Sequence, residues 1–405
     1  MTSGISKKLL AGVMAAGLLG AAPALAQDAT IGSLVPVTGD LQAYGPNNAM
    51  GAELAAKHVN DQGGLLDGGT LSVAIGDTQT NAQAGVDAAQ KLVSVDGVVG
   101  IVGALSSGVS GPVATSVTGP AGIPQISPAS TAPVLTTIED NDFFFRTTPH
   151  DALQGVVLAQ VAKDAGYNNL AVIYINNDYG EGLANAFSDA YKELGGEVSA
   201  SLAYEIGNAS YRGELQNAAG GGGEALVLIG YPENGITIIR QALEGGFFEK
   251  FIFTDGMRDS SIVEASGDYL NGSIGTNPAA VADNPATETF SDLWKEAYGE
   301  EELKPFTSNA YDGAFILALA IEKAGSTDPK AIRDAMRAVA GPPGEKVLPG
   351  EWAKAKELIA AGTDIDYDGA AGSQDFDDAG DVPGTFAHWT IENGEIKTVD
   401  IIAPK

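Results

Sequence analysis

The apolar residues of this chain fall into short runs that alternate with longer amphipathic stretches. Short runs bounded by Gly, Asn, Asp or Ser are typical of strands buried on both faces of a parallel sheet. They occur at 30–35, 71–75, 98–102 and 122–126. The stretches between them place apolar residues three or four positions apart, as in helices with one buried face. The repeated strand–helix order predicts a parallel sheet with helices on both faces.

The pattern restarts after a crossing segment that ends near Pro149. Strands are predicted at 170–175, 198–203, 225–229 and 251–253, with helices between them. Further helices are predicted at about 286–298, 308–324, 329–339 and 352–360, and terminal strands at 386–391 and 395–401.

We therefore predict an α/β protein with two doubly wound lobes, a hinge and a cleft between the lobes. The chain crosses near residues 147, 276 and 380. Lobe 1 then consists of 27–148 and 277–380, and lobe 2 of 149–276 and 381–405.

Two hydroxyl-rich turns follow neighbouring strands of lobe 1. The first is Ser106-Ser107-Gly108, and the second runs from Ser127 to Thr131 and includes Ala129 and Ser130. Open α/β sheets bind ligands at the carboxyl ends of their strands, where free N–H groups and hydroxyls suit a small carboxylate. Ser and Thr are also common helix caps. One such turn would indicate only a cap, whereas two adjacent turns favour a binding site.

Three polar turns in lobe 2 offer a complementary chemistry. They contain Tyr179, Tyr231 and Asp255, each just after a predicted strand. The tyrosines could pack in loops and Asp255 could cap a helix. Taken together with the serine turns, however, an acid and two aromatic rings suit an α-amino acid zwitterion with an apolar side chain.

The first 26 residues have the order of a secretory signal. Lys7 and Lys8 precede the apolar run 9–22, and Ala24-Leu25-Ala26 supplies small residues for cleavage near Ala26. The rest of the chain has 20 basic and 52 acidic residues and a net charge of −32. This charge disfavours nucleic acid and anionic lipid as partners. The chain contains no cysteine, which excludes disulfides and thiol chemistry.

Catalytic and metal-binding patterns are weak. His58, His150 and His388 have no acid/base or metal spacing, and neither a G-x-S-x-G nor a phosphate-loop motif occurs. The acidic stretch 364–375 fits a calcium loop loosely, but no helix clearly follows it. We predict no enzyme activity, no cofactor and no metal.

The chain resembles the periplasmic branched-chain amino-acid binding proteins of ABC importers, which have the type I periplasmic-binding fold. Six segments carry the resemblance in the family's order: residues 39–45, GALSSG at 103–108, SPASTAP at 127–133, NDYGEG at 177–182, GYPENG at 230–235 and TDG at 254–256.

The resemblance implies a set of ligand-binding residues. Ser107, Ala129 and Thr131 hold the carboxylate and part of the ammonium group, with Ser130 in the same turn. Tyr179 and Tyr231 close from lobe 2, Tyr44 borders the side-chain pocket, and Asp255 pairs with the ammonium. Many relatives have Glu where this chain has the shorter Asp255.

The resemblance also implies a biological role. We expect a monomeric periplasmic receptor that delivers a leucine-like amino acid to an inner-membrane ABC permease, with no membrane insertion after signal cleavage. The alternative is a sensor of the same fold that binds an amide or a small carboxylate and controls a partner.

Overall fold

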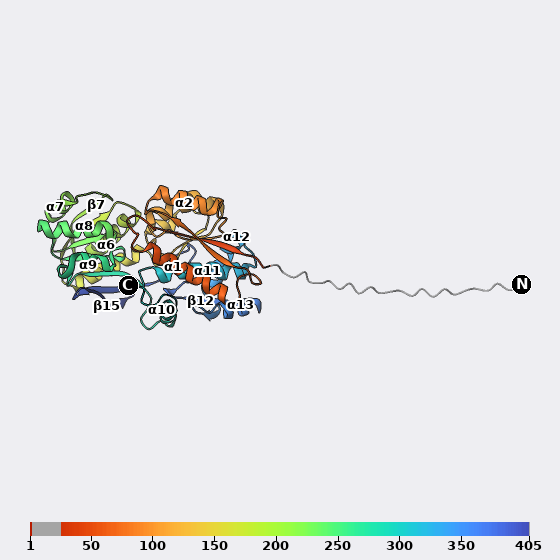
Figure 1. The fold of residues 1–405 in the computed structure, drawn as a ribbon. Helices are drawn as coiled ribbons and strands as arrows, with labels where there is room; N and C mark the ends of the chain where they lie inside the picture. Colours follow the sequence, from red (N-terminus) through yellow and green to blue (C-terminus); the bar gives the residue numbers. More distant parts are fainter. Residues whose placement is uncertain (2–25, 405) are drawn as a thin grey trace.

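The computed structural model describes Met1 and residues 26–404. The predicted signal at 1–26 thus lies outside the described residues, except at its two ends. Within the described part of the chain, no helix is long and apolar enough to cross a membrane. Figure 1 shows two α/β lobes side by side, one carrying α6 to α9 and the other carrying α1, α2 and the later helices.

The sheet of lobe 1 has five parallel strands in the order β2-β1-β3-β4-β5. They are β1 (Ala29–Val35), β2 (Leu71–Asp77), β3 (Ile101–Gly103), β4 (Gln125–Ser127) and β5 (Phe144–Arg146). Strands β2 and β3 flank β1 on opposite sides, so the strand order reverses between β1 and β3. Ligands bind at such switch points, outside the carboxyl ends of the strands.

Lobe 2 has a seven-stranded sheet in the order β15-β14-β10-β9-β8-β6-β7. Its strands are β6 (Asn169–Ile175), β7 (Glu197–Tyr204), β8 (Leu226–Ile229), β9 (Phe251–Phe253), β10 (Ile274–Ala279), β14 (Thr385–Glu392) and β15 (Glu395–Ile402). The last two pair antiparallel, and the others are parallel. The reversal here lies between β6 and β8. Strands β9, β14 and β15 occur where the sequence predicts them.

Helices cover both sheets. Those that follow strands in the first half are α1 (Gly45–Asp61), α2 (Ala82–Ser94), α3 (Ser107–Val113), α4 (Gly119–Ala121), α5 (Asp151–Asp164), α6 (Asp178–Glu193), α7 (Arg212–Ala219), α8 (Pro232–Gly245) and α9 (Ser260–Ser266). The later ones are α10 (Pro285–Tyr298), α11 (Thr307–Ala324), α12 (Pro329–Ala340) and α13 (Trp352–Ala360). Shorter turns are η1 (Ala114–Thr118), η2 (Pro133–Thr137), η3 (Asp255–Met257) and η4 (Gly267–Leu270).

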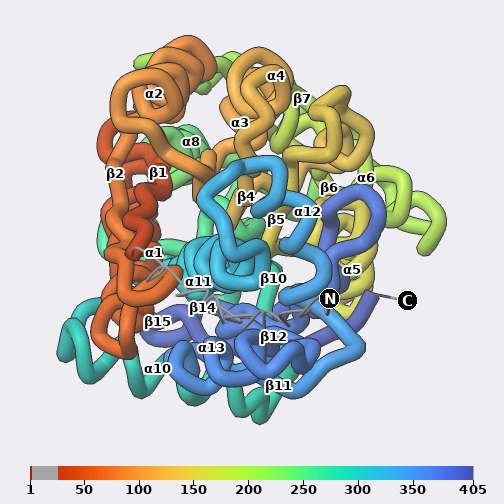
Figure 2. The backbone as a smooth tube through the Cα atoms, turned by 90° about the vertical axis from the view of Figure 1, so that its right-hand side faces the viewer, coloured from red at the N-terminus to blue at the C-terminus, as the bar shows by residue number. Residues whose placement is uncertain are grey.

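The chain returns to lobe 1 after β10. Helix α11 packs against α1, and Figure 2 shows the two side by side beneath the strands of lobe 1. One hydrophobic core joins Ile31 of β1 and Ile126 of β4 to Phe315 of α11 and Trp352 of α13. The sequence correctly predicts α11 as an apolar, buried helix.

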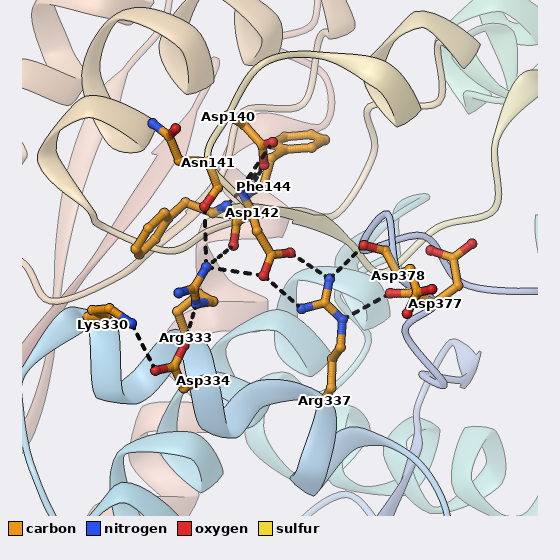
Figure 3. A network of polar contacts seen from close by, with 11 residues as sticks. Asp140, Asn141, Asp142, Phe144, Lys330, Arg333, Asp334, Arg337, Asp377 and Asp378 are labelled. Carbon is orange, nitrogen blue, oxygen red and sulfur yellow. Dashed lines mark hydrogen bonds and ion pairs between the residues drawn. The ribbon is translucent and has the colours of Figure 1, made fainter.

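The predicted crossing at 276 falls inside β10, which stays in the lobe 2 sheet to Ala279. Ion pairs hold the other two crossing regions together. Buried Arg146, at the end of β5, bonds Asp381 with 2.5 Å between Nε and Oδ1. Figure 3 shows a second network, in which Asp142 pairs with Arg333 and Arg337 of α12. Arg337 also donates to the carbonyl oxygens of 377 and 378.

The acidic stretch near the C-terminus is a strand rather than a turn. It forms β12 (Ile365–Gly369), which pairs with β11 (Glu345–Val347) and β13 (Gly372–Ser373). Ile365, Asp366 and Tyr367 are all buried, and Asp366 pairs with Lys346, with 3.0 Å between Oδ2 and Nζ. A buried aspartate between two apolar residues hides this strand in the sequence.

Candidate ligand-binding site

A cavity of about 300 Å³ lies between the lobes, where the two switch points face each other. Lobe 1 and the returning chain contribute one wall, and lobe 2 contributes the other. The lining residues are Leu41, Tyr44, Leu105, Ser107, Ala129, Tyr179, Tyr231, Asp255, Gly256 and Phe306. Six of the eight residues predicted as ligand contacts therefore line one cavity: Tyr44, Ser107, Ala129, Tyr179, Tyr231 and Asp255.

The first serine turn is shaped by Gly103 at the end of β3. Its φ is +139°, and a Cβ there would lie 2.2 Å from the carbonyl oxygen of Leu34, so only glycine fits. The chain then turns and makes Ser107 the first residue of α3. The first N–H groups of a helix have no partner inside it and attract anions. The Ser107 hydroxyl accepts a bond from the backbone N–H of Ala132, with 3.1 Å between Oγ and N.

In the second serine turn, Ser130 and Thr131 do not line the cavity, although the sequence predicts both as ligand contacts. Ser130 lies behind the cavity wall, where its Oγ lies 2.8 Å from Ser110 Oγ and 3.1 Å from the carbonyl oxygen of Leu105. Thr131 is fully buried beside the cavity, and its Oγ1 has no hydrogen-bond partner among the described residues. Ser130 thus links the two turns, while the Thr131 hydroxyl lies near the carboxyl group of Asp151.

Arg146 fixes the second turn from behind. Its Nη1 donates to the carbonyl oxygens of Ala132 and Ser130, at 2.9 and 3.3 Å, and its Nη2 donates to Thr136 Oγ1 at 2.6 Å. No role for Arg146 can be predicted from the sequence, because a single arginine in a crossing segment does not reveal which groups it will bond.

The lobe 2 wall consists of two stacked rings. Tyr179 and Tyr231 lie nearly parallel, with 5.7 Å between their centroids. The Tyr231 hydroxyl lies 3.1 Å from Ser106 Oγ in lobe 1. On the opposite side, the Tyr44 hydroxyl donates to the carbonyl oxygen of Gly256 at 3.2 Å. These two contacts bridge the lobes and enclose the cavity.

Asp255 begins η3, directly after β9, and is 3% exposed. Its Oδ1 accepts bonds from the Tyr179 hydroxyl at 2.9 Å and from Gln154 Nε2 at 3.0 Å. Burial raises the pKa of Asp255 to about 6, although these hydrogen bonds favour the charged form. The backbone N–H groups of Asp255 and Gly256 also favour the charged form.

A second acid, Asp151, accompanies Asp255 and was missed by the sequence analysis. It is the first residue of α5 and is fully buried, and neither carboxylate oxygen has a hydrogen-bond partner among the described residues. Burial, and then the negative charge of Asp255, raise its pKa well above the ordinary value, while Thr131 and Arg146 act against this. An aspartate at a helix start is common for electrostatic reasons alone, so its position gave no warning.

Two further acids were expected to cap helices or face water. Asp178 is exposed, as expected, and Asn177 is the residue that caps α6. Glu233 differs, since it is only partly exposed and its Oε2 is buried without a partner among the described residues. Burial raises the pKa of Glu233 to about 7, against the effect of the Gln42 side chain across the cleft. The expectation failed because closure of the lobes buries this helix start.

The model of a known family matches residues 28–369 of the chain, and that family is described as periplasmic binding protein. The chain belongs to the periplasmic binding protein family. Its two-lobed architecture is the type I periplasmic-binding fold, as the sequence predicts. A leucine-binding protein LivK from Thermotoga maritima superposes with a TM-score of 0.79 at 26% identity, covering 93% of this chain and 99% of that one.

Two curated relatives differ in what their names state. The Leu/Ile/Val-binding protein homolog 1 of Brucella suis biovar 1 is 31% identical, over 82% of this chain and 88% of its own length. The chemotactic signal transduction system substrate-binding protein BasB of Halobacterium salinarum is 27% identical, over 86% of this chain and 83% of its own length. Together with the family match, these similarities identify the chain as a substrate-binding receptor of the branched-chain amino-acid binding type.

Proposed function

We propose that this receptor captures a small α-amino acid with an apolar side chain between its lobes. The single observation that carries the proposal is a pair of buried carboxylates close to the serine turns: Asp255 lines the lobe 2 wall of the cavity, and Asp151 lies beside the second turn, where its backbone N–H donates to the carbonyl oxygen of Thr131. A buried carboxylate without a cationic or hydrogen-bonding partner is costly. A ligand ammonium group would supply that partner, and the serine turns would accept the ligand carboxylate.

The proposed contacts follow from the geometry. The N–H and hydroxyl of Ser107 and the N–H of Thr131 would bind the carboxylate, with the backbone of Ala129 alongside. The Thr131 hydroxyl and both aspartates would surround the ammonium group. The rings of Tyr179 and Tyr231 would exclude water from this charged end of the ligand.

The rest of the cavity suits an apolar side chain of modest size. Leu41, Leu105, Tyr44 and Phe306 line it, and Gly256 leaves room beside them. Because these walls offer few hydrogen-bonding groups, they favour leucine, isoleucine or valine over side chains with polar ends. We propose the branched-chain amino acids as the primary ligands.

We further propose that the receptor is exported by the segment 1–26 and delivers its ligand to an inner-membrane ABC permease. Closure would occur about the segments near 147, 280 and 381, in which Arg146 bonds Asp381. The second candidate is a chemotactic or other sensor that presents the closed form to a signalling partner. The name of the Halobacterium salinarum relative favours this alternative.

The test is calorimetry on ligand-free protein, with leucine, isoleucine and valine compared with their deaminated acids. The expected result is binding of the amino acids and at least tenfold weaker binding of the deaminated acids. Tighter binding of the deaminated acids would overturn the amino-acid assignment. Two assays on cells that lack the protein distinguish a transport receptor from a sensor. Loss of labelled leucine uptake indicates a transport receptor, and loss of movement toward leucine indicates a sensor.

A further inference from the structure

A larger hollow adjoins the ligand cavity on the far side of Phe306. It has a volume of about 1850 Å³ and opens to solvent between the lobes and the crossing segments. Arg258, Asn277, Lys304, Ser308 and Asn309 provide polar groups in its wall. Phe306 lines both the cavity and this hollow, so the two spaces adjoin at this residue.

Arg258 has unusual surroundings for an arginine of this chain. Four of the six arginines at 26–404, namely Arg146, Arg212, Arg333 and Arg337, are in ion pairs, two of which are visible in Figure 3. The fifth, Arg240, is exposed on α8. Arg258 is partly buried, and its Nε is inaccessible to solvent, yet its side chain has no ion pair or hydrogen bond among the described residues.

The acids near Arg258 are engaged elsewhere. Asp259 and Glu302 both bond Lys304, each with 2.8 Å between the oxygen and Nζ. Burial lowers the pKa of Arg258, and the nearby Tyr44 and Glu302 only partly oppose this. In a chain with a net charge of −30, a guanidinium without a carboxylate partner is able to bind an anionic group of a ligand.

Arg258 also lies close to the proposed ligand. It follows Gly256, which lines the cavity, by two residues, and its charge acts on the hydroxyl of Tyr44, another lining residue. Phe306, which stands between, has a φ of +66°, a left-handed conformation that is unfavourable for a bulky residue. Its neighbours therefore hold the backbone of Phe306, and a ligand could pass toward Arg258 only if the ring rotates about its side-chain torsions.

We propose that the side-chain end of the site extends past Phe306 to the guanidinium of Arg258. The receptor would then also accept α-amino acids whose side chain ends in a carboxylate. This proposal rests on the proposed function, because the α-ammonium and α-carboxylate groups would occupy the same contacts as those of leucine. The apolar walls would surround the methylene groups, and Arg258 would bind the distal carboxylate.

The test is calorimetry at pH 7.5 with the ligand-free protein and four probes: leucine, aspartate, glutamate and 2-aminoadipate. The three acidic probes differ by one methylene group each and thus report the reach to Arg258. We expect at least one of them to bind the natural protein. In Arg258→Gln, the dissociation constant of that acidic probe, divided by the dissociation constant of leucine, should rise at least tenfold. Arg240→Gln, the matched control on the surface of the same lobe, should leave this ratio within twofold.

Phe306→Ala provides an independent test of the extension. Removal of the ring should lower the ratio of acidic probe to leucine dissociation constants, and Arg258→Gln in the same background should cancel that gain. Melting curves check that each variant folds.

Leucine binding without any acidic-probe binding would overturn the extension but not the proposed function. An unchanged ratio in Arg258→Gln would do the same. Failure of all four probes would instead remove the proposed function, and the extension with it.

Discussion

Two aspartates of this protein are both fully buried and have opposite surroundings. Asp312, in α11 of lobe 1, accepts hydrogen bonds from the Tyr367 hydroxyl at 2.7 Å, from the N–H groups of Ala370 and Ala371 at 2.8 Å each, and from Gln374 Nε2 at 3.3 Å. Asp151, behind the second serine turn, has no oxygen within hydrogen-bond geometry of a donor among the described residues, and only the nearby Thr131 hydroxyl and Arg146 favour its charged form. Both carboxyl groups are fully shielded from solvent.

The difference separates a structural acid from a binding acid. Removing a carboxylate from water is costly, and the four donors that the fold supplies offset this cost for Asp312 only in part, because burial still raises its pKa to about 7. Asp151 receives no such donor from the fold, so its carboxylate favours either a proton or a cation from outside. The ammonium group of the proposed amino-acid ligand would be such a cation. Asp255 is intermediate between the two, because its Oδ1 accepts bonds from Tyr179 and Gln154 and yet burial still raises its pKa to about 6.

The first prediction, with the largest expected effect, concerns the contribution of Asp312 to stability. Asp312→Ala leaves several buried donors unpaired, including two backbone N–H groups, so we expect the free energy of unfolding to fall by about 4–5 kcal/mol. Asp151→Ala is the matched control, and it should change stability by about 1 kcal/mol or less because no hydrogen bond is lost. Guanidinium denaturation followed by circular dichroism measures both. Equal losses in the two variants would contradict the distinction.

The second prediction concerns binding. Asp255→Asn and Asp151→Asn should each weaken leucine binding by about 2–5 kcal/mol, since each removes a charge from the desolvated ammonium site. The double variant should lose less than the sum, because both acids serve one ammonium group. Asp178→Asn, an exposed acid near the cleft, is the control and should bind leucine normally. Calorimetry measures the dissociation constant of leucine in each variant. Full leucine affinity in Asp255→Asn would exclude this residue as the ammonium partner.

The third prediction distinguishes the hydroxyls of the serine turns. Ser107→Ala and Thr131→Ala should each weaken binding by about 1–3 kcal/mol, the range for hydrogen bonds to charged groups. Thr131→Ala should change stability little, whereas Ser107→Ala also leaves the buried N–H of Ala132 without its acceptor and should lower stability by about 1–3 kcal/mol. Ser130→Ala should mainly reduce the melting temperature, because its hydroxyl bonds Ser110 and the 104–105 backbone. Unchanged affinity in both Ser107→Ala and Thr131→Ala would remove these residues from the site.

Much of this site could be predicted because its residues follow strands. Alternation of strands and helices placed Ser107, Ala129, Tyr179, Tyr231 and Asp255 at the carboxyl ends of two sheets, and the family resemblance assigned their roles. Asp151 could not be found this way, since it differs from an ordinary helix-start acid only through burial and missing partners. Those properties arise when distant elements meet. Arg146 and Arg258 were missed for the same reason, because one bonds the turns from behind and the other lacks a partner.

The last prediction is the smallest and uses pH to separate the two effects of the buried acids. Their pKa values are raised in the fold, to about 6 for Asp255 and about 7 for Asp312. The folded form therefore holds protons more tightly than the unfolded chain, and this contribution to stability is lost as pH rises from about 4 through 6 to 7. The ligand-free protein should melt at a lower temperature at pH 8 than at pH 5.

Ligand binding should respond in the opposite direction. An ammonium group requires a charged Asp255, so leucine affinity should rise about tenfold from pH 5 to pH 7 and level off above that. Proton release on binding, measured by calorimetry in buffers of different ionisation enthalpy, should be largest near pH 5. In Asp255→Asn this rise should diminish, whereas in Asp178→Asn it should persist. An affinity that does not change between pH 5 and pH 7 would mean that Asp255 is already charged before the ligand arrives, and that the protein itself supplies its counter-charge.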